Sequence, residues 1–355
     1  MQSTKIKEIS YESKKIKKGT IKYKINNFPD YLKSWVKTFS GALTLFCLII
    51  LIVIPFLSTE QSYVEFFLPH FTLAMIFAIL AASWDLLTGI SGQISFGQSI
   101  FFGIAGYLCA YLIDYQGFPI WLSIIIGTAG AVFFSLIIGI PALRLKGPYL
   151  ALGTLVFSII LLKLFLLGSL SEWLFGSEGI SGLPKMSESS VLTYFIVFIT
   201  MIITFIAIIQ ISKSKLGTIF KSIRDDETGS EASGINTTKY KIIAFMLSGV
   251  FAGIAGTYYA LYNTAVNPTG NFGVTISFFA ILMASLGGLA TITGSAMGAF
   301  FFIFVEYILI ELGAADYVQL IFALTLILVV RFADRGILKP TLERLKDLWD
   351  VLLGK

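Results

Sequence analysis

The sequence is poor in charged residues for its length. Only 13% of its 355 residues are Asp, Glu, Lys or Arg, whereas 56% are hydrophobic. A soluble domain is about a quarter charged, because its whole surface faces water. The apolar residues also occur in long runs that a soluble core would interrupt. Lipid is the solvent that suits both features, so the sequence predicts an all-α polytopic membrane protein.

Residues and motifs for metal, redox or covalent chemistry are scarce. The cysteines, Cys47 and Cys109, both lie in apolar runs, and with the single histidine, His70, they cannot form a zinc site. The chain also lacks a P-loop, a His-Glu-x-x-His motif and a Gly-x-Ser-x-Gly motif. We therefore expect a protein that is not an enzyme and holds no metal or cofactor. If ATP drives its function, a partner has to bind the nucleotide.

What the sequence has instead is a series of apolar runs of membrane length. About 17–25 apolar residues cross about 30 Å of hydrocarbon. The best count is ten spans, with a range of eight to eleven because the connections around 91–97 and 291–294 are very short. The expected spans are residues 41–57, 66–90, 97–115, 119–140, 149–168, 190–211, 242–262, 274–290, 295–311 and 315–331.

The basic residues indicate how these spans are oriented. With ten spans, all of the 26 Lys and Arg residues except Lys163 and Lys185 fall in segments that share one side of the membrane. Basic residues favour the cytoplasmic side, so both termini are expected in the cytoplasm. The loops on the opposite side carry acidic residues, namely Glu60, Glu65, Glu172, Glu178 and Glu188.

The same map divides the chain into segments. Residues 1–40 form a Lys-rich cytoplasmic tail without a cleavable signal peptide, residues 41–337 form the membrane domain, and residues 338–355 form a second cytoplasmic tail. Within the membrane domain, 169–189 is an external loop and 212–241 is the longest cytoplasmic loop. The Lys-rich tail is expected to meet anionic lipid rather than nucleic acid.

One polar segment, residues 84–98, separates two strongly apolar helices. Its glycines, mixed with Ser and Gln, disfavour a continuous helix. Irregular backbone at membrane depth is tolerated only where protein or a water-filled cavity satisfies it, as in the broken helices of transporters. Two interpretations stay open, namely the lining of a substrate pathway and a tight cytoplasmic turn. The pathway candidates are Asp85, Gly92, Gln93, Ser95, Gly97 and Gln98.

A second polar segment, residues 223–236, lies in the long cytoplasmic loop. Residues 225–233 are predicted to form a short helix, because acidic side chains favour its first turn and Gly234 suits a left-handed stop. Small side chains beside a carboxylate at 231–233 suit close docking against another protein. A solvated loop helix is the alternative interpretation.

Small and ionisable residues inside the spans carry further predictions. Small residues four positions apart in the seventh and ninth spans predict close helix packing. Lys163 and Glu306 lie in the outer thirds of their spans, where they either pair or extend to the outer interface, the latter being favoured for Lys163. The small-residue pairs are Gly249 with Gly253, Ala252 with Gly256, and Gly294 with Gly298.

Six motifs occur in order along the chain. They are Asp85 through Tyr107, Arg144 through Tyr149, Gly176 through Pro184, Ile223 through Phe245, Leu286 through Leu289, and Arg331 through Gly336. Single pieces are weak, whereas six in order at suitable spacing are specific. Over about residues 70–337 the chain resembles the LivM-type permeases of branched-chain amino acid ABC importers, within a wider superfamily that includes LivH and ribose permeases.

The resemblance implies a permease subunit that imports branched-chain or related small amino acids by alternating access in the cell membrane of a prokaryote. It further implies two ATPase subunits that bind ATP and Mg, a second permease subunit of LivH type, and an external substrate-binding protein. Residues 224–234 become a coupling helix against an ATPase, through Arg224, Glu227, Glu231, Ala232, Ser233 and Gly234. The external loop is expected to receive the binding protein through Gly176, Ser177, Glu178, Gly182 and Pro184.

The chain departs from the family pattern at three positions. Ile159 and Phe278 stand where the family often carries Glu, and Gln98 replaces a frequent His. A pathway with fewer carboxylates changes the expected substrate preference, so urea and short amides stay open as alternatives. A rival of another class is an ion-coupled secondary transporter in which the ionisable residues of the spans bind an ion. That rival needs an ion gradient rather than an ATPase.

Overall fold

The computed structural model describes residues 39–57, 61–145, 147–170 and 174–332. The chain divides into two compact units. The described part of the smaller unit consists of α3 (Phe39–Val53) and a 3-10 turn, η1 (Ile54–Phe56). The larger unit, from Thr59 to Leu342, contains the remaining elements. The predicted cytoplasmic tails lie outside the described residues, apart from the start of α3.

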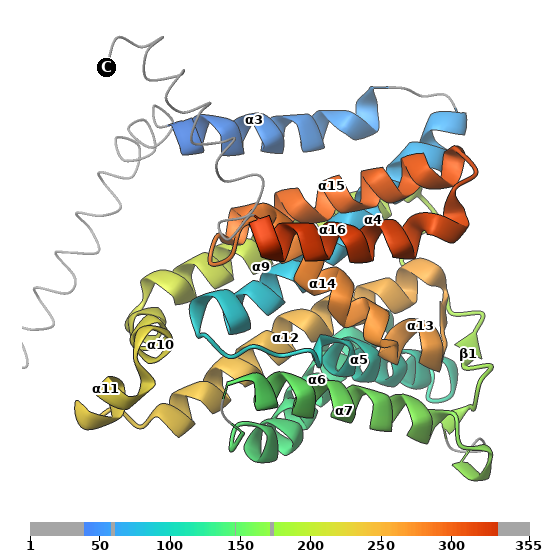
Figure 1. Cartoon of the computed structure of the whole chain (residues 1–355). Coiled ribbons are helices and arrows are strands. Elements are labelled where there is room, and N and C mark those ends of the chain that lie inside the picture. Colours follow the sequence, from blue (N-terminus) through green and yellow to red (C-terminus); the bar gives the residue numbers. More distant parts are fainter. Residues whose placement is uncertain (1–38, 58–60, 146, 171–173, 333–355) are drawn as a thin grey trace, which may run out of the picture. The chain divides into compact units, whose positions relative to one another are not determined.

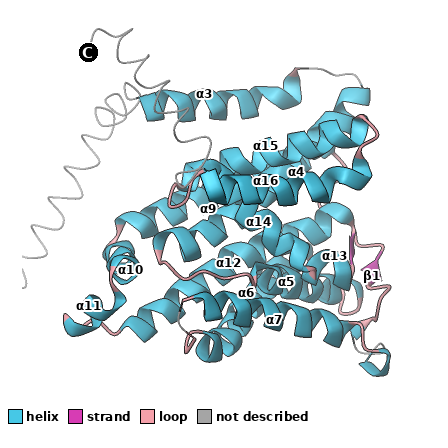
Figure 2. Cartoon of the chain, viewed as in Figure 1, coloured by secondary structure: helices cyan, strands magenta, loops and turns pink. Residues whose placement is uncertain are grey.

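The larger unit is built almost entirely from helices (Figure 1 and Figure 2). In its described residues, two short 3-10 turns, η3 (Gly168–Leu170) and η4 (Ala315–Tyr317), and one π-helical turn, η2, stand between them. The helices are α4 (Gln61–Asp85), η2 (Leu86–Ile90), α5 (Gln98–Asp114), α6 (Ile120–Ala142), α7 (Pro148–Phe165), α9 (Ser190–Lys213), α10 (Lys215–Asp225), α11 (Glu227–Ala232), α12 (Thr237–Asn263), α13 (Pro268–Phe272), α14 (Val274–Gly287), α15 (Ile292–Glu311) and α16 (Val318–Phe332).

Each of the ten expected spans coincides with an apolar helix. Within the described ranges, seven helices are long and apolar enough to cross a membrane, and the other expected spans match the shorter apolar helices Phe46–Phe56, Gln98–Asp114 and Ala315–Leu328. The chain is therefore an all-α polytopic membrane protein. The seven long helices are Phe67–Ile90, Ile120–Ala142, Pro148–Phe165, Ser190–Lys213, Thr237–Asn263, Pro268–Gly287 and Ile292–Glu311.

The core of the larger unit is formed by α4, α5 and α12. Helix α12 packs against α4, α5 and α6, and nearly every side chain of α4 beyond Phe71 is buried. Large apolar side chains on α6, α7 and α9 face outward instead, among them Trp121, Phe133, Tyr149 and Ile203. Such surfaces suit lipid or another membrane subunit, because water would oppose so much exposed apolar area.

Glycine permits the closest helix contacts in this core. A Cβ atom at Gly256 of α12 would lie 2.0 Å from the Phe102 carbonyl oxygen of α5. A Cβ atom at Gly298 of α15 would lie 1.9 Å from the Met283 carbonyl oxygen of α14. A larger residue would push these backbones apart. The prediction of close packing in the seventh and ninth spans is therefore confirmed.

A two-stranded sheet closes the end of the unit where α12 stops. Strand β1 (Ile180–Ser181) pairs antiparallel with β2 (Ala265–Val266), with Ile180 opposite Val266. The Leu183 N–H also donates to the Thr264 carbonyl oxygen at 3.0 Å. This pairing holds the loop before α9 against the end of α12 (Figure 1).

Candidate functional site

The predicted interruption between the second and third spans is present. After Asp85, α4 gives way to η2, and irregular backbone then leads to α5. Protein groups satisfy this irregular backbone. The Trp84 indole N–H donates to the Ser95 carbonyl oxygen at 2.7 Å, and the Gly97 N–H donates to Ser95 Oγ at 3.2 Å. Backbone that leaves a helix at membrane depth requires such partners.

Gln98, at the start of α5, lies in a buried polar cluster with Ser83 and Ser248. Its Nε2 donates to Ser83 Oγ at 2.6 Å and to Ser248 Oγ at 2.9 Å. Ser248 Oγ in turn donates to the Ser83 carbonyl oxygen at 3.0 Å. None of the three residues has exposed surface. The amide therefore links α4, α5 and α12 inside the core, where hydrogen bonds rigidify the packing.

The six pathway candidates are mostly enclosed by protein. Five of them are buried, and Gly92 is half-buried. Gln93 is held locally, because its Nε2 donates to the Ser91 carbonyl oxygen at 3.3 Å and its own carbonyl accepts from Thr88 Oγ1 at 3.1 Å. The segment forms a packed interruption of the helix here, and pathway lining by these residues stays a prediction.

Asp85 connects this interruption to a second one, between α14 and α15. Its Oδ1 accepts a hydrogen bond from the Ala290 N–H at 2.7 Å, and Ala290 has left-handed backbone with φ +58°. Gly89 packs closely against the two atoms of this hydrogen bond, since a Cβ atom at Gly89 would lie 2.1 Å from Asp85 Oδ1 and 2.6 Å from the Ala290 nitrogen. The carboxylate thus joins the end of α4 to the connection between α14 and α15.

Arg224, near the end of α10, also contacts the helix interruption that follows Asp85. Its Nη1 donates to the Gly89 carbonyl oxygen at 2.9 Å, and its Nε and Nη2 donate to Asp225 Oδ1 at 3.0 Å and 2.9 Å. Gly92, with φ +73°, approaches so closely that a Cβ atom would lie 2.9 Å from Arg224 Cα. The guanidinium thus binds the helix interruption of its own chain, and the contact with an ATPase that the family resemblance implies for Arg224 stays a prediction.

The short helix predicted at 225–233 is present as α11 (Glu227–Ala232). Asp226 caps it, because its Oδ1 accepts the Gly229 N–H at 2.9 Å. Gly234 follows its end with φ +84°, as expected for a left-handed stop. The helix is shorter than predicted because Asp225 belongs to α10 and Asp226 has extended backbone between the two helices.

Two acidic residues tie α11 to the first turns of α12. Glu227 forms an ion pair with Lys241, whose side chain is only 6% exposed. Glu231 accepts a hydrogen bond from Thr237 Oγ1 at 2.6 Å. The two carboxylates therefore fix α11 in place from within the chain. The residues of this segment that are exposed for a partner include Thr228, Ala232, Ser233 and Gly234.

The candidates for docking a binding protein lie around β1. Gly179, with φ +70°, sits so close to β2 that a Cβ atom would lie 1.9 Å from the Val266 carbonyl oxygen. The strand pair thus holds the loop, and loops on a rigid frame are suited to recognition. Among the candidates, Ser177, Glu178, Gly182 and Pro184 are exposed and Gly176 is buried. Their role in docking stays a prediction.

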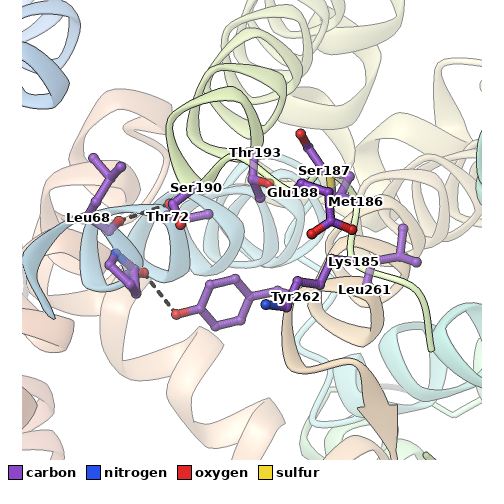
Figure 3. A pocket seen from close by; sticks show the side chains of 11 residues that line it. Leu68, Thr72, Lys185, Met186, Ser187, Glu188, Ser190, Thr193, Leu261 and Tyr262 are labelled. Atoms are coloured by element: carbon purple, nitrogen blue, oxygen red, sulfur yellow. Dashed lines mark hydrogen bonds between the residues drawn. The ribbon is translucent and has the colours of Figure 1, made fainter. Parts of the chain in front are cut away.

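A small pocket that the sequence did not predict lies beside this loop (Figure 3). Its volume is about 160 Å³, and it is lined by α4, residues 185–188, the start of α9 and the end of α12. Lys185 and Glu188 contribute charges, and Tyr262 Oη donates to the Pro69 carbonyl oxygen at 3.1 Å. This volume is below the roughly 300 Å³ at which small-molecule sites begin. None of the six pathway candidates lines it.

Comparison with known proteins accounts for this architecture. A family model described as "Branched-chain amino acid transport system / permease component" matches residues 67–330, from α4 into α16. The chain belongs to this permease family. The family's members are permease components of transport systems, so the expectation that the protein is not an enzyme is confirmed.

Individual relatives resemble this permease at low identity, two of them over most of its length and a third over about a third of it. The high-affinity branched-chain amino acid transport system permease protein LivM of Escherichia coli strain K12 is 26% identical over 304 residues, which cover 78% of this chain and 70% of LivM. The corresponding LivH protein of Salmonella typhimurium is 24% identical over 297 residues, which cover 77% of this chain and 94% of LivH. The ribose import permease protein RbsC of Escherichia coli K12 is 29% identical over 125 residues, which cover 34% of this chain and 39% of RbsC.

Two positions where this permease departs from the family pattern lie on its surface. Ile159 of α7 is 39% exposed and Phe278 of α14 is 38% exposed. The Phe278 ring lies 5.8 Å from the ring of Phe96, which belongs to the interruption before α5. The two departures therefore make an exposed surface of the permease more apolar and leave its core unchanged.

Lys163 and Glu306 do not form an ion pair. Neither of the two ion pairs found within the described ranges involves them, and Lys163 is exposed while Glu306 is half-buried. The predicted alternative, in which Lys163 extends along apolar surface toward the interface, agrees with this exposure.

Four residues that hold these sites were not predicted from the sequence, namely Ser83, Lys241, Ser248 and Ala290. Lys241 had a detectable signal, because a lysine in the second turn of a long apolar helix needs an anionic partner. The other three had none, since each makes a contact that joins residues 150 or more positions apart in the chain.

Proposed function

We propose that this permease is a membrane subunit of an ATP-binding-cassette importer that translocates branched-chain or related small amino acids. The observation that carries the proposal is the short helix α11, which is capped, tied to α12 and exposed along Thr228, Ala232 and Ser233. A rigid helix with small exposed side chains at a bundle end is suited to receive force from a partner. Family membership makes a transport ATPase the partner of choice.

We infer ten spans with both termini in the cytoplasm, a membrane domain from 41 to 337, and tails at 1–40 and 338–355. Loops that the basic residues assign to one side also contact one another. Arg224 of the long cytoplasmic loop meets Gly89 and Ala290 lies beside Asp85, while β1 of the external loop pairs with β2 after α12. These contacts support the alternation of sides, and the Lys and Arg distribution supports the orientation.

The proposed complex contains two ATPase subunits, a second permease subunit of LivH type and an external binding protein. ATP and Mg bind in the ATPases, and this chain supplies no catalytic group. Relatives named LivM and LivH each carry the description of a branched-chain amino acid permease, which supports a pair of related membrane subunits. The outward-facing apolar side chains of α6 and α7 are available to such a subunit or to lipid. The complex resides in the cell membrane of a prokaryote.

Alternating access is the proposed mechanism. The loaded binding protein docks on the loop around β1, and the substrate enters between the two permease subunits. ATP binding in the partners then displaces α11 and shifts a two-state helix bundle. Urea or a short amide is the alternative substrate for the same machinery, because Ile159 and Phe278 replace frequent carboxylates of the family. An ion-coupled carrier is the rival mechanism.

The test is a substitution on the exposed side of α11. Ala232→Arg places a long cation on an exposed residue at the end of α11. We expect normal insertion in the membrane, with ATPase association and amino acid uptake each reduced about tenfold or more, as for a central interface residue. Co-purification with the ATPase and uptake in vesicles measure the two effects. The control is Thr218→Arg, which places the same side chain on an exposed position of α10.

Two results would contradict the proposed function. One is normal ATPase association and uptake in the Ala232→Arg variant. The other is accumulation of solute by the reconstituted chain without partners, driven by a sodium or proton gradient, which would favour the ion-coupled carrier.

A further inference from the structure

We propose that Arg224 is a positioning residue that transmits movement of α10 and α11 to two helix interruptions inside the permease. The proposal rests on the proposed function, because it concerns the step after an ATPase has engaged α11. It assigns Arg224 a partner within its own chain in place of a partner in the ATPase.

The contacts that carry the proposal form one group, which we call the junction. It consists of Asp85, Gly89, Gly92, Arg224 and Ala290, from three segments that are far apart in the sequence. The Arg224 guanidinium donates to the Gly89 carbonyl oxygen at 2.9 Å, and Asp85 Oδ1 accepts the Ala290 N–H at 2.7 Å. A single arginine on α10 therefore contacts the group that also holds the connection between α14 and α15.

The backbones of the junction approach one another closely at Gly89 and Gly92, although the Arg224 side chain is partly exposed. A Cβ atom at Gly92 would lie within 2.9 Å of Arg224 Cα, and one at Gly89 would lie 2.1 Å from Asp85 Oδ1. Close-packed groups transmit displacement instead of absorbing it. A shift of α10 therefore has to displace η2, and a shift of η2 has to displace the Asp85 contact with Ala290.

Helix α10 is packed against the rest of the larger unit and also contacts α11. Phe220 and Ile223 are buried, so one face of α10 is anchored, and Ser222 Oγ lies 2.8 Å from Ser230 Oγ of α11. Movement of α11 is thus carried into α10 and to Arg224. A parallel contact, the ion pair of Glu227 with Lys241, leads from α11 into α12, which is one continuous helix.

The interruptions at η2 and at 288–291 are the elements able to change direction. One is a π-helical turn and the other is a break with left-handed backbone. Either element is able to bend without breaking a regular series of α-helical hydrogen bonds. Both lie next to the ends of spans, namely α4, α5, α14 and α15. Arg224 contacts η2 through the Gly89 carbonyl, and Asp85 in turn joins the end of α4 to the break at 288–291, whereas the ion pair of Glu227 ends on a straight span. This difference makes Arg224 the residue that couples α11 to rearrangement of the bundle.

The experiment uses the complete importer, with ATPases, second permease subunit and binding protein, reconstituted in vesicles. In Arg224→Met, we expect normal assembly and normal basal ATP hydrolysis. Because both processes depend on the same movement between α11 and the helix bundle, stimulation of hydrolysis by the loaded binding protein and substrate uptake should both fall, by about tenfold or more. Arg224→Lys retains a charged donor and should recover part of both. Lys221→Met removes an exposed charge of α10 and should behave as the wild type.

Hydrogen exchange supplies a second readout that a purely structural role would not alter. In the wild type, ATP binding should change exchange in residues 86–97 together with residues 220–232. In Arg224→Met, or in Arg224→Lys if the methionine variant does not accumulate, the change should stay confined to 220–232. Wild-type uptake by Arg224→Met would overturn the proposal, and so would loss of ATPase association, which would make Arg224 a docking residue. If the wild-type chain itself retained no ATPase, the proposed function would fail instead.

Discussion

The two ends of the helix bundle are held together by different kinds of contact. At the end that carries α11, charged side chains bind groups of distant segments, as Arg224 binds the Gly89 carbonyl and Asp85 the Ala290 N–H. At the end that carries β1, backbone pairs with backbone, and Glu178 is exposed. The helix α12 runs from the first end to the second (Figure 1).

This difference suits one end of the bundle to pass on movement and the other end to bind another protein. A side chain that is buried and paired loses its partner when a helix moves, so movement at the α11 end changes the free energy of the whole bundle. A strand pair keeps a loop rigid while its exposed side chains meet another protein at little cost to stability. The first end is therefore suited to a mechanical partner, and the second to a binding partner.

The largest expected difference between the two ends comes from adding one methyl group at a glycine of each. Gly89→Ala places a Cβ atom 2.1 Å from Asp85 Oδ1, whereas at Gly182, with φ +82°, a Cβ atom meets nothing within 4 Å. We expect Gly89→Ala to lower the free energy of unfolding by about 3 kcal/mol. Gly182→Ala should cost only about 1 kcal/mol of backbone strain. Denaturant unfolding of the detergent-purified protein measures both, and equal costs would remove the contrast between the ends.

An intermediate effect is expected from the ion pair behind α11. Glu227→Gln leaves Lys241, whose side chain is 6% exposed, without an anion, whereas Lys241→Met leaves Glu227, which is 32% exposed. The first change should cost about 3 kcal/mol and the second about 1 kcal/mol, since water solvates the more exposed charge. The double variant should cost less than the sum of the two. Unfolding midpoints of the four proteins test this order, and a larger cost for Lys241→Met would refute it.

The smallest change in stability is expected at the recognition end. Glu178→Gln should alter the free energy of unfolding by less than about 0.5 kcal/mol, because the side chain is exposed. The same change should slow association with the binding protein and weaken its salt dependence. Glu178→Asp retains the charge and serves as the control. Unchanged association kinetics in Glu178→Gln would remove this residue from the docking surface.

Much of the fold was predictable because it depends on local sequence. The apolar runs match the helices in order, the interruption at 84–98 is present, and α11 stops before Gly234 as expected. The bounds of α11 were less accurate, since Asp225 has a polar side chain that fits either helix. Only the structure shows that it ends α10 and pairs with Arg224.

The contacts that the site residues make within the chain were less predictable. Glu227 and Glu231 are predicted to meet an ATPase, and within the chain both also bind residues at the start of α12. Arg224 carries the same prediction, and its guanidinium also binds Gly89. The sequence identifies a charged segment between spans, but it does not show which residues of the chain these charges contact. The prediction of the segment and the prediction of its individual contacts therefore have different reliability.

By itself, the sequence determined the solvent, the helices and the family of this protein. These properties follow from composition, from the length of apolar runs and from short motifs, all of which are local features of the sequence. The tertiary structure alone decided that Asp85 meets Ala290 and that Arg224 meets Gly89, across 205 and 135 positions of the chain. Such contacts depend on how the packed helices bring their ends together, and glycine at a few positions allows the backbones to come that close.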